Sequence, residues 1–328
     1  MFEKLETSFL NLITDTKFIG TKKPHIIVGL SGGPDSVFLF HFLLNLKNKN
    51  LIELSAAHLN HGWRIEAENE AQWCQKISLY NNVRIYVENG QNLTPVITKK
   101  TGSQEDLGRQ MRHAFFDNLQ KTIGADFVAL AHHADDQIET FFIRLARGST
   151  TTGLCGMKPR SGNTIRPLLN IHKSQILDYL KTNNIEYLTD PTNFGDHNLR
   201  SRIRTHLIPA LQQADSRFEH KILTTMSRLN EDAQIVEDST NQAFKDCFES
   251  KNGVLVGSVT KLNEFSLPLQ KQVVLKWLIL EQAIFEPSDA FLQEILRFLL
   301  SPRGGSHDIG QNLTIKKSKE TFFLHKTA

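Results

Sequence analysis

The chain carries Ser31-Gly32-Gly33-Pro34-Asp35-Ser36 between an apolar run that predicts a strand, residues 25–30, and one that predicts a helix, residues 37–46. The glycines allow a tight turn, the serines add hydroxyl donors, and the helix directs its positive end at the same point. We therefore predict a phosphate-binding loop. Asp35 would repel phosphate unless Mg2+ bridges the two, which makes Asp35 a candidate metal ligand. A glycine turn without a ligand is the alternative.

Composition indicates a globular protein of more than one domain. The chain has 328 residues, 40% of them hydrophobic, and a net charge of +3. Its apolar runs are too short to cross a bilayer and its start lacks the features of a signal peptide, so we expect a cytoplasmic protein without membrane contact. The cysteines Cys74, Cys155 and Cys247 are far apart, which argues against a disulfide framework or a zinc or iron–sulfur site.

Short β-branched runs alternate with helical stretches over the first 190 residues. The runs are residues 25–30, 51–59, 83–87, 127–131 and, more weakly, 164–169. This alternation predicts the α/β class, with a parallel, doubly wound, Rossmann-like sheet. Ligands bind at the carboxyl ends of such strands, where three unusual segments fall: residues 31–36, 58–62 and 131–136.

The third of these segments combines His132 and His133 with carboxylates at the start of a predicted helix that runs to residue 146. Asp136 and Glu139 are three residues apart, so both lie on one helix face and could hold a metal ion or an ammonium group. The alternative is an acidic first turn that only caps the helix. Adjacent histidines are likewise often structural.

Arginines mark two further candidate sites. Ser103 and Asp106 predict the start of a helix on which Arg109 and Arg112 share a face, where they could neutralise phosphate or remain solvated. The segment 147–157 that follows the acidic helix is rich in glycine and hydroxyl groups and predicts a mobile loop.

A second basic region suggests contact with nucleic acid. Arg200, Arg202 and Arg204 alternate along the chain before a long predicted helix, residues 216–248. A solvated basic face is the alternative. If these arginines are helical they span more than one face, so one of them could point into the cleft.

The rest of the chain predicts a small α+β domain. Helical patterns cover residues 267–283 and 290–300, and a hairpin-like end is centred on residues 309–312. We therefore expect a catalytic domain over residues 1–215, a connecting helix over 216–250 and a small carboxyl-terminal domain over 251–328.

Taken together, these motifs resemble the tRNA(Ile)-lysidine synthetase family, which belongs to the PP-loop or N-type ATP pyrophosphatase superfamily. The resemblance is strong over residues 24–211 and weaker from residue 302 onward. The later blocks, in order, separate this family from its relatives. The segments that carry it are Ser31 to Ser36, His58 to Gly62, Arg109 to Arg112, His132 to Thr140, Arg147 to Ser149, Arg166 to Leu169, Asp190 to Asn193 and Arg200 to Leu211.

The resemblance implies an ATP-dependent ligase that forms a carbon–nitrogen bond. Its substrates would be ATP, free L-lysine and an isoleucine tRNA with a CAU anticodon. ATP would adenylate the C2 carbonyl oxygen of the wobble cytosine and release diphosphate. The lysine ε-amine would then attack C2 and expel AMP to give lysidine. No membrane partner is implied, and a homodimer stays open.

The resemblance also implies roles for single residues. The roles are as follows: Ser31, Gly32, Gly33, Pro34, Asp35 and Ser36 bind the diphosphate portion of ATP; His58 and Asn60 flank adenine; Asp35 and Asp136 face Mg2+; Arg112, His133, Asp136 and Glu139 organise the reacting groups; Arg200, Arg202 and Arg204 contact tRNA. Which of the histidines and carboxylates binds lysine stays open.

Two other functions are compatible with the same loop. Another PP-loop tRNA-modifying enzyme, such as a thiolase, would share the ATP site but would need suitably spaced cysteines. An ATP-responsive RNA-binding module would need another reason for the acidic charge of Asp35, Asp136 and Glu139 beside two anionic ligands. Longer members of the resembled family also carry one more carboxyl-terminal domain.

Overall fold

The computed structural model describes residues 2–14, 23–63, 67–93, 104–189, 198–283, 288–310 and 312–326. The chain divides into two compact units, Met1–Ser227 and Arg228–Ala328. No helix in the described ranges is long and apolar enough to cross a membrane. The residues Ser103 and Asp190 to Asn193, on which parts of the sequence interpretation depend, lie outside these ranges.

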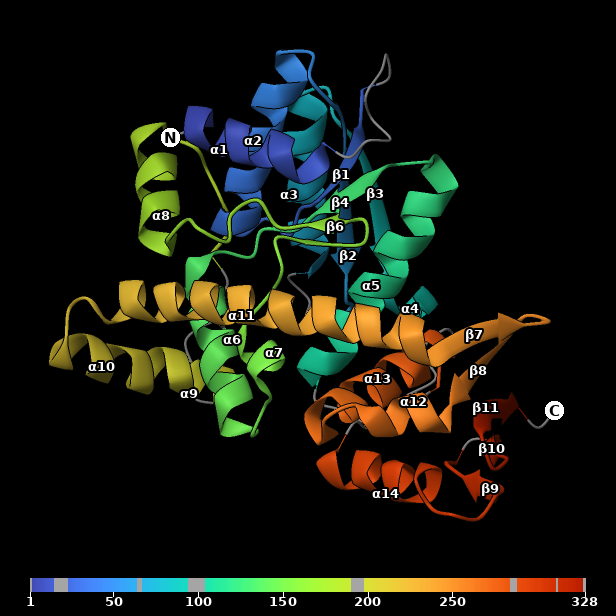
Figure 1. Cartoon of the computed structure of the whole chain (residues 1–328). Coiled ribbons are helices and arrows are strands. Elements are labelled where there is room, and N and C mark those ends of the chain that lie inside the picture. The colour runs from blue at the N-terminus through green and yellow to red at the C-terminus, as the bar shows by residue number, and fades with distance from the viewer. Residues whose placement is uncertain are drawn as a thin grey trace. The chain divides into compact units, whose positions relative to one another are not determined.

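A six-stranded sheet forms the centre of the first unit (Figure 1). Its strands are β1 (His25–Gly29), β2 (Glu53–Asn60), β3 (Arg84–Asn89), β4 (Phe127–Ala129), β5 (Arg160–Ser161) and β6 (Thr164–Ile165), in the order β3-β2-β1-β4-β6-β5. All pairs are parallel except β5–β6, which form a short antiparallel hairpin at the edge. The doubly wound parallel sheet is thus confirmed. The β5 strand was not predicted, because two residues are too short to show a period.

The first unit contains helices on both faces of this sheet and others that pack beside α6. They are α1 (Phe2–Ile13), α2 (Pro34–Asn48), α3 (Ala67–Tyr80), α4 (Gly90–Leu93), α5 (Gln104–Ile123), α6 (Ala134–Ala146), α7 (Thr151–Leu154), α8 (Lys173–Thr182), α9 (Leu199–Arg202), the π-helical turn η4 (Ile203–Leu207) and α10 (Ile208–Ala214). A long helix, α11 (Phe218–Cys247), begins in the first unit and ends in the second.

The strand β1 shows how the sequence pattern places these helices. Ile26 and Val28 belong to a core with α1, α2 and α8, whereas Ile27 belongs to a core with α5 (Figure 1). Successive strand residues point to opposite faces, so a continuous apolar run indicates a sheet covered on both sides. Helix α2 is apolar almost all round, as expected for a helix buried on every side.

The order of the strands places a topological switch point at the carboxyl end of β1, where a ligand crevice is expected. The chain moves outward from β1 to β2 and β3, and then returns to the other side of β1 as β4. The segments that leave β1 and β4 therefore diverge at the carboxyl ends of these strands, where ligands bind in such sheets. Helices α2, α6 and α8 begin after β1, β4 and β6, which are neighbours.

The second unit contains a five-stranded antiparallel sheet with helices. Its elements are β7 (Phe248–Lys251), β8 (Val254–Ser258), α12 (Val259–Glu264), α13 (Leu267–Leu280), α14 (Asp289–Leu299), β9 (Gly305–Asp308), β10 (Leu313–Lys317) and β11 (Thr321–Lys326), with strand order β7-β8-β11-β10-β9. Trp277 and Phe322 are fully buried in its core. The two helical patterns and the hairpin between β9 and β10 agree with the prediction.

Candidate active site

The loop between β1 and α2 has the form expected of an anion-binding turn. Gly32 has φ +88°, a conformation that L side chains rarely adopt, so the backbone requires glycine here. The Ser36 hydroxyl accepts a hydrogen bond from the Ser31 N–H at 3.2 Å and donates one to the Gly33 carbonyl at 2.9 Å. Helix α2 then begins at Pro34. Hydrogen bonds within the loop therefore hold its backbone, and the amino end of helix α2 lies directly after it.

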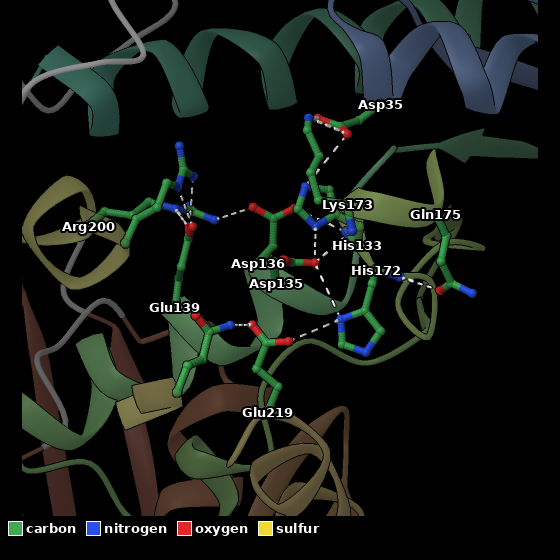
Figure 2. A network of polar contacts seen from close by, with 12 residues as sticks. Asp35, His133, Asp135, Asp136, Glu139, His172, Lys173, Gln175, Arg200 and Glu219 are labelled. Carbon is green, nitrogen blue, oxygen red and sulfur yellow. Dashed lines mark hydrogen bonds and ion pairs between the residues drawn. The ribbon is translucent and has the colours of Figure 1, made fainter. Parts of the chain in front are cut away.

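Asp35, on the first turn of α2, is held by a lysine that sequence reasoning missed. The Lys173 ammonium donates to both carboxylate oxygens of Asp35 at 2.5 Å (Figure 2). Lys173 is the first residue of α8, and three residues separate it from the Arg166 to Leu169 block. A basic residue at a helix start so close to that block was the available signal.

His133 lies between three carboxylates at the start of α6. Its Nε2 atom is 3.7 Å from Oδ1 of Asp35 and 3.5 Å from Oδ2 of Asp136, and its Nδ1 is 3.4 Å from Oδ2 of Asp135 (Figure 2). Burial lowers the pKa of His133, but the contact with Asp135 and the charges of the other two carboxylates outweigh burial and raise it. His133 therefore lies between Asp35 and Asp136, and its raised pKa favours the protonated form there.

Asp135 joins the beginnings of two helices. Its Oδ2 accepts a hydrogen bond from the backbone N–H of Lys173 at 2.9 Å and lies 3.8 Å from Nδ1 of His172. Burial raises the pKa of Asp135, but the contact with His133 and this backbone hydrogen bond outweigh burial and lower it to about 2. The sequence interpretation assigned no role to Asp135, whose neighbours in space lie on a distant segment.

Asp136 and Glu139 share one face of α6, as their spacing predicts, and Arg200 binds both. Arg200 donates to Oδ1 of Asp136 at 2.7 Å and to Oε2 of Glu139 at 2.6 Å (Figure 2). Arg204 donates to Oε1 of Glu139 at 2.5 Å. The capping alternative also holds for Asp136, whose Oδ2 accepts from the His133 N–H at 3.0 Å. A guanidinium thus occupies the place between the two carboxylates.

The pKa values of Asp136 and His132 are both lowered, which favours the charged carboxylate and the neutral imidazole. Burial raises the pKa of Asp136, but His133 and Arg200 hold it below its usual range. Burial lowers the pKa of His132, Asp136 opposes this, and the charges of Arg166, Arg200 and Arg112 add to the lowering, so that the pKa is about 4. Buried Nδ1 of His132 has no hydrogen-bond partner among the residues that the structure describes. His132 is therefore neutral at pH 7.

His58 and Asn60, the predicted adenine neighbours, are buried at the end of β2. The His58 ring hydrogen-bonds through Nδ1 to the Leu30 carbonyl at 2.8 Å, directly before the phosphate loop. Asn60 accepts from the Gly62 N–H at 2.8 Å and donates to Glu68 at 3.3 Å. Both side chains lie at the carboxyl end of β2, and their contact with adenine stays a prediction.

The segment after α6 differs from the mobile loop that its composition predicts. Arg144 donates to the carbonyls of Gly153 and Gly156, at 2.5 and 2.9 Å. Gln137 exchanges two hydrogen bonds with the backbone of Met157, at 2.9 and 2.7 Å. Side chains of α6 therefore hold this segment, an interaction that composition cannot reveal.

The donor set suits a magnesium ion that arrives with phosphate. The described part of the chain has no cluster of three or more His, Cys, Asp or Glu residues that could hold a metal by itself. Mg2+ commonly uses only one or two carboxylates together with substrate phosphates. Asp35 beside the phosphate loop fits that pattern, and Asp136 is linked to it through His133. All three cysteines are free.

The fold and the site together define an α/β protein with a glycine-rich, phosphate-type loop after its first strand. Comparison with known families agrees with this class. The family model for the PP-loop domain matches residues 1–211, so the chain belongs to the PP-loop domain family.

The similar curated proteins share one name. The chain is 32% identical over 255 residues to tRNA(Ile)-lysidine synthase of Geobacillus kaustophilus, covering 76% of this chain and 54% of that protein. It is 33% identical over 312 residues to tRNA(Ile)-lysidine synthase of Bacillus subtilis, covering 90% of this chain and 64% of that protein. The chain thus spans between half and two thirds of the length of these relatives.

A solved structure supports the fold alone. The U34-tRNA thiolase NcsA from Methanococcus maripaludis, with its [4Fe-4S] cluster, aligns with a TM-score of 0.57 at 16% identity. The alignment covers 70% of this chain and 78% of that chain.

Proposed function

We propose that this chain is a tRNA(Ile)-lysidine synthetase, an ATP-dependent ligase that joins L-lysine to C2 of the wobble cytidine of a CAU anticodon. The observation that carries the proposal is that His133 links the phosphate loop to Asp136 at the carboxyl ends of the strands. The names of the similar proteins and the PP-loop family support the choice of substrates. The reaction would release diphosphate and then AMP.

In the first step the loop residues Ser31 to Ser36 would bind the diphosphate portion of ATP with backbone N–H groups and hydroxyls. Asp35 would hold Mg2+, which supplies positive charge to the phosphate oxygens when bound. Arg112 would add a further positive charge, and its proximity is indicated by its effect on His132. Adenylation needs these groups but no lysine.

In the second step the lysine amine must lose a proton, because its ordinary pKa is about 10.4. His132 is neutral at pH 7, and its buried Nδ1 has no hydrogen-bond partner in the described ranges, so it is available to accept that proton, although its pKa of about 4 makes it a weak base. Asp136 and Glu139 would stabilise the charged amine on entry. For this, the amine must compete with Arg200, which now binds both carboxylates.

We assign tRNA contact to the basic residues and to the second unit. Arg202 and Arg204 are both exposed, but Arg204, like the partly buried Arg200, binds Glu139. Arg202 is thus the arginine of the three best placed for phosphate contact, and the other two would act on tRNA only through the acidic site. We propose residues 1–215 as the catalytic domain and 251–328 as a tRNA-binding domain joined by the long helix.

The deciding experiment measures diphosphate release with ATP, isoleucine tRNA and lysine. We expect release to require the tRNA, and AMP-tRNA to accumulate when lysine is withheld. The matched control is the same tRNA with uridine in place of the wobble cytidine, which should give no release. Release that depends on a sulfur donor would indicate a thiolase instead. RNA binding without any diphosphate release would indicate a binding module.

A further inference from the structure

Lys173 holds a position that its own helix disfavours. It is the first residue of α8, where the positive end of the helix dipole repels a cation. Helices α2 and α6 also direct their amino ends to this edge of the sheet. Asp35 compensates this repulsion, since both of its oxygens accept from the Lys173 ammonium at 2.5 Å (Figure 2). Departures from local preference are expected where a residue serves function.

The backbone of Lys173 is fixed, while its side chain is accessible. Asp135 binds the Lys173 N–H at 2.9 Å and so anchors the start of α8 to α6. The side chains of Lys173 and Asp35 are 33% and 26% exposed. A ligand can therefore reach the ion pair from solvent, and the flexible four-carbon stem of lysine lets the ammonium move without moving the helix.

The ammonium occupies the face of Asp35 that a divalent cation would use. A carboxylate whose two oxygens both bind one ammonium cannot also present both to Mg2+, and two cations on one carboxylate repel each other. Binding of a metal ion at Asp35 therefore weakens the ion pair and favours release of the ammonium. The phosphate loop beside Asp35 offers the released ammonium a new anionic partner only when phosphate is present.

We propose, building on the proposed use of ATP, that Lys173 is an exchangeable counter-ion of Asp35. In the nucleotide-free protein Lys173 neutralises Asp35 and keeps free divalent ions out. When Mg2+ enters together with the nucleotide, the metal ion takes Asp35 and the Lys173 ammonium moves to the diphosphate oxygens. The metal site is thereby made conditional on the nucleotide, and Lys173 becomes a diphosphate-binding residue.

The test compares two affinities that should change in opposite directions in Lys173→Met. Free Mn2+ without nucleotide should bind about fivefold more tightly than to the unmodified protein, because Asp35 has lost its competitor. Inorganic diphosphate with Mg2+ should bind about fivefold or more weakly, because one cation is missing. Electron paramagnetic resonance measures the first affinity, and calorimetry measures the second.

Two variants serve as controls. Lys181→Met, on the exposed last turn of the same helix, should change neither affinity. Lys173→Arg keeps the positive charge and should keep Mn2+ binding weak. Lys173→Gln provides a second neutral variant if the methionine variant folds poorly, as judged by circular dichroism.

The outcomes separate this inference from the proposed function. Folded neutral variants that lose both Mn2+ and diphosphate affinity, or that keep both unchanged, would overturn the exchange. Neither measurement uses tRNA or lysine, so failure of lysidine formation leaves the exchange testable. An unmodified protein that does not bind diphosphate at all would overturn the phosphate loop and, with it, both proposals.

Discussion

Glu139 is the most enclosed carboxylate of the acidic site, with 1% exposure and both oxygens bound by arginines. Asp136 is more exposed, and His133 lies between it and Asp35 of the phosphate loop. We therefore expect Asp136→Asn to abolish adenylation, because it serves the metal side. Glu139→Gln should still form AMP-tRNA but should raise the lysine concentration required for turnover.

Labelled AMP trapped on tRNA without lysine distinguishes these two roles. An Asp136 variant that accumulates the intermediate would reverse the assignment. If both variants adenylate and turn over normally, the two carboxylates act only as a cap and as partners of Arg200, and the reacting groups lie elsewhere.

Cysteine reactivity provides a second prediction for single residues. Burial raises the pKa of the Cys74 thiol to about 12 and that of Cys247 to about 11. Cys155 is only partly buried. Since the thiolate is the reactive form, iodoacetamide at pH 8 should modify Cys155 first and leave the other two intact in the folded protein. Mass spectrometry of peptides reads this directly, and early labelling of Cys74 would show that the core near the phosphate loop opens.

At the scale of elements, Asp135 should stabilise the junction of α6 and α8. We expect Asp135→Asn to lower the free energy of unfolding at pH 7 by about 1–2 kcal/mol, with allowance for solvent screening of a side chain that is 30% exposed. A depressed pKa stabilises the fold above the ordinary value of 3.8, and this contribution is lost as pH falls toward about 2. Urea unfolding between pH 7 and pH 3 should show the variant and the unmodified protein converging, whereas a constant difference would contradict the charge argument.

Elements with strong local signals were predictable from sequence. The start of α6 and its end at Ala146 agree with the prediction, because an acidic first turn precedes an amphipathic run. The strand β1 agrees as well, bounded by a glycine turn. The strand β5 escaped prediction because it has only two residues, and the segment after α6 did so because side chains of α6 hold its backbone.

For the whole molecule, two separate cores predict separable losses. Trp277 is fully buried in the second unit, so Trp277→Ala should destabilise that unit by about 3–5 kcal/mol. Nucleotide binding should survive and tRNA affinity should fall, because we assign nucleotide binding to the first unit and part of the tRNA contact to the second. Phe40→Ala, in α2 of the first core, is the matched change and should weaken nucleotide binding. Loss of nucleotide binding in the Trp277 variant would contradict the division.

Binding of tRNA should depend on salt in part through Arg202. Arg202→Ala should weaken tRNA binding at low salt and reduce the slope of log affinity against log salt by about one, as for one lost phosphate contact. Arg204→Ala is the matched variant, since Arg204 binds Glu139 and should change turnover more than the salt slope. Equal slopes for the Arg202 variant and the unmodified protein would remove Arg202 from the tRNA surface.

Local physics explains what the sequence determined by itself. The loop from Ser31 to Ser36 was recognisable because its backbone demands glycine and because an apolar run lies on either side of it. The pairing of Asp136 with Glu139 followed from helical spacing. The α/β class followed from the alternation of the runs. Each of these depends on residues a few positions apart.

Only the tertiary structure decided which distant charges meet. Lys173 and Asp35 are 138 residues apart, and Arg200 is 61 residues from Glu139. The first pair meets because β1, β4 and β6 are neighbours in the sheet, which places the starts of α2, α6 and α8 together. Coulomb interactions act through space and leave no periodic trace in the sequence, so the partner of each carboxylate becomes visible only once the sheet has set the order of its strands.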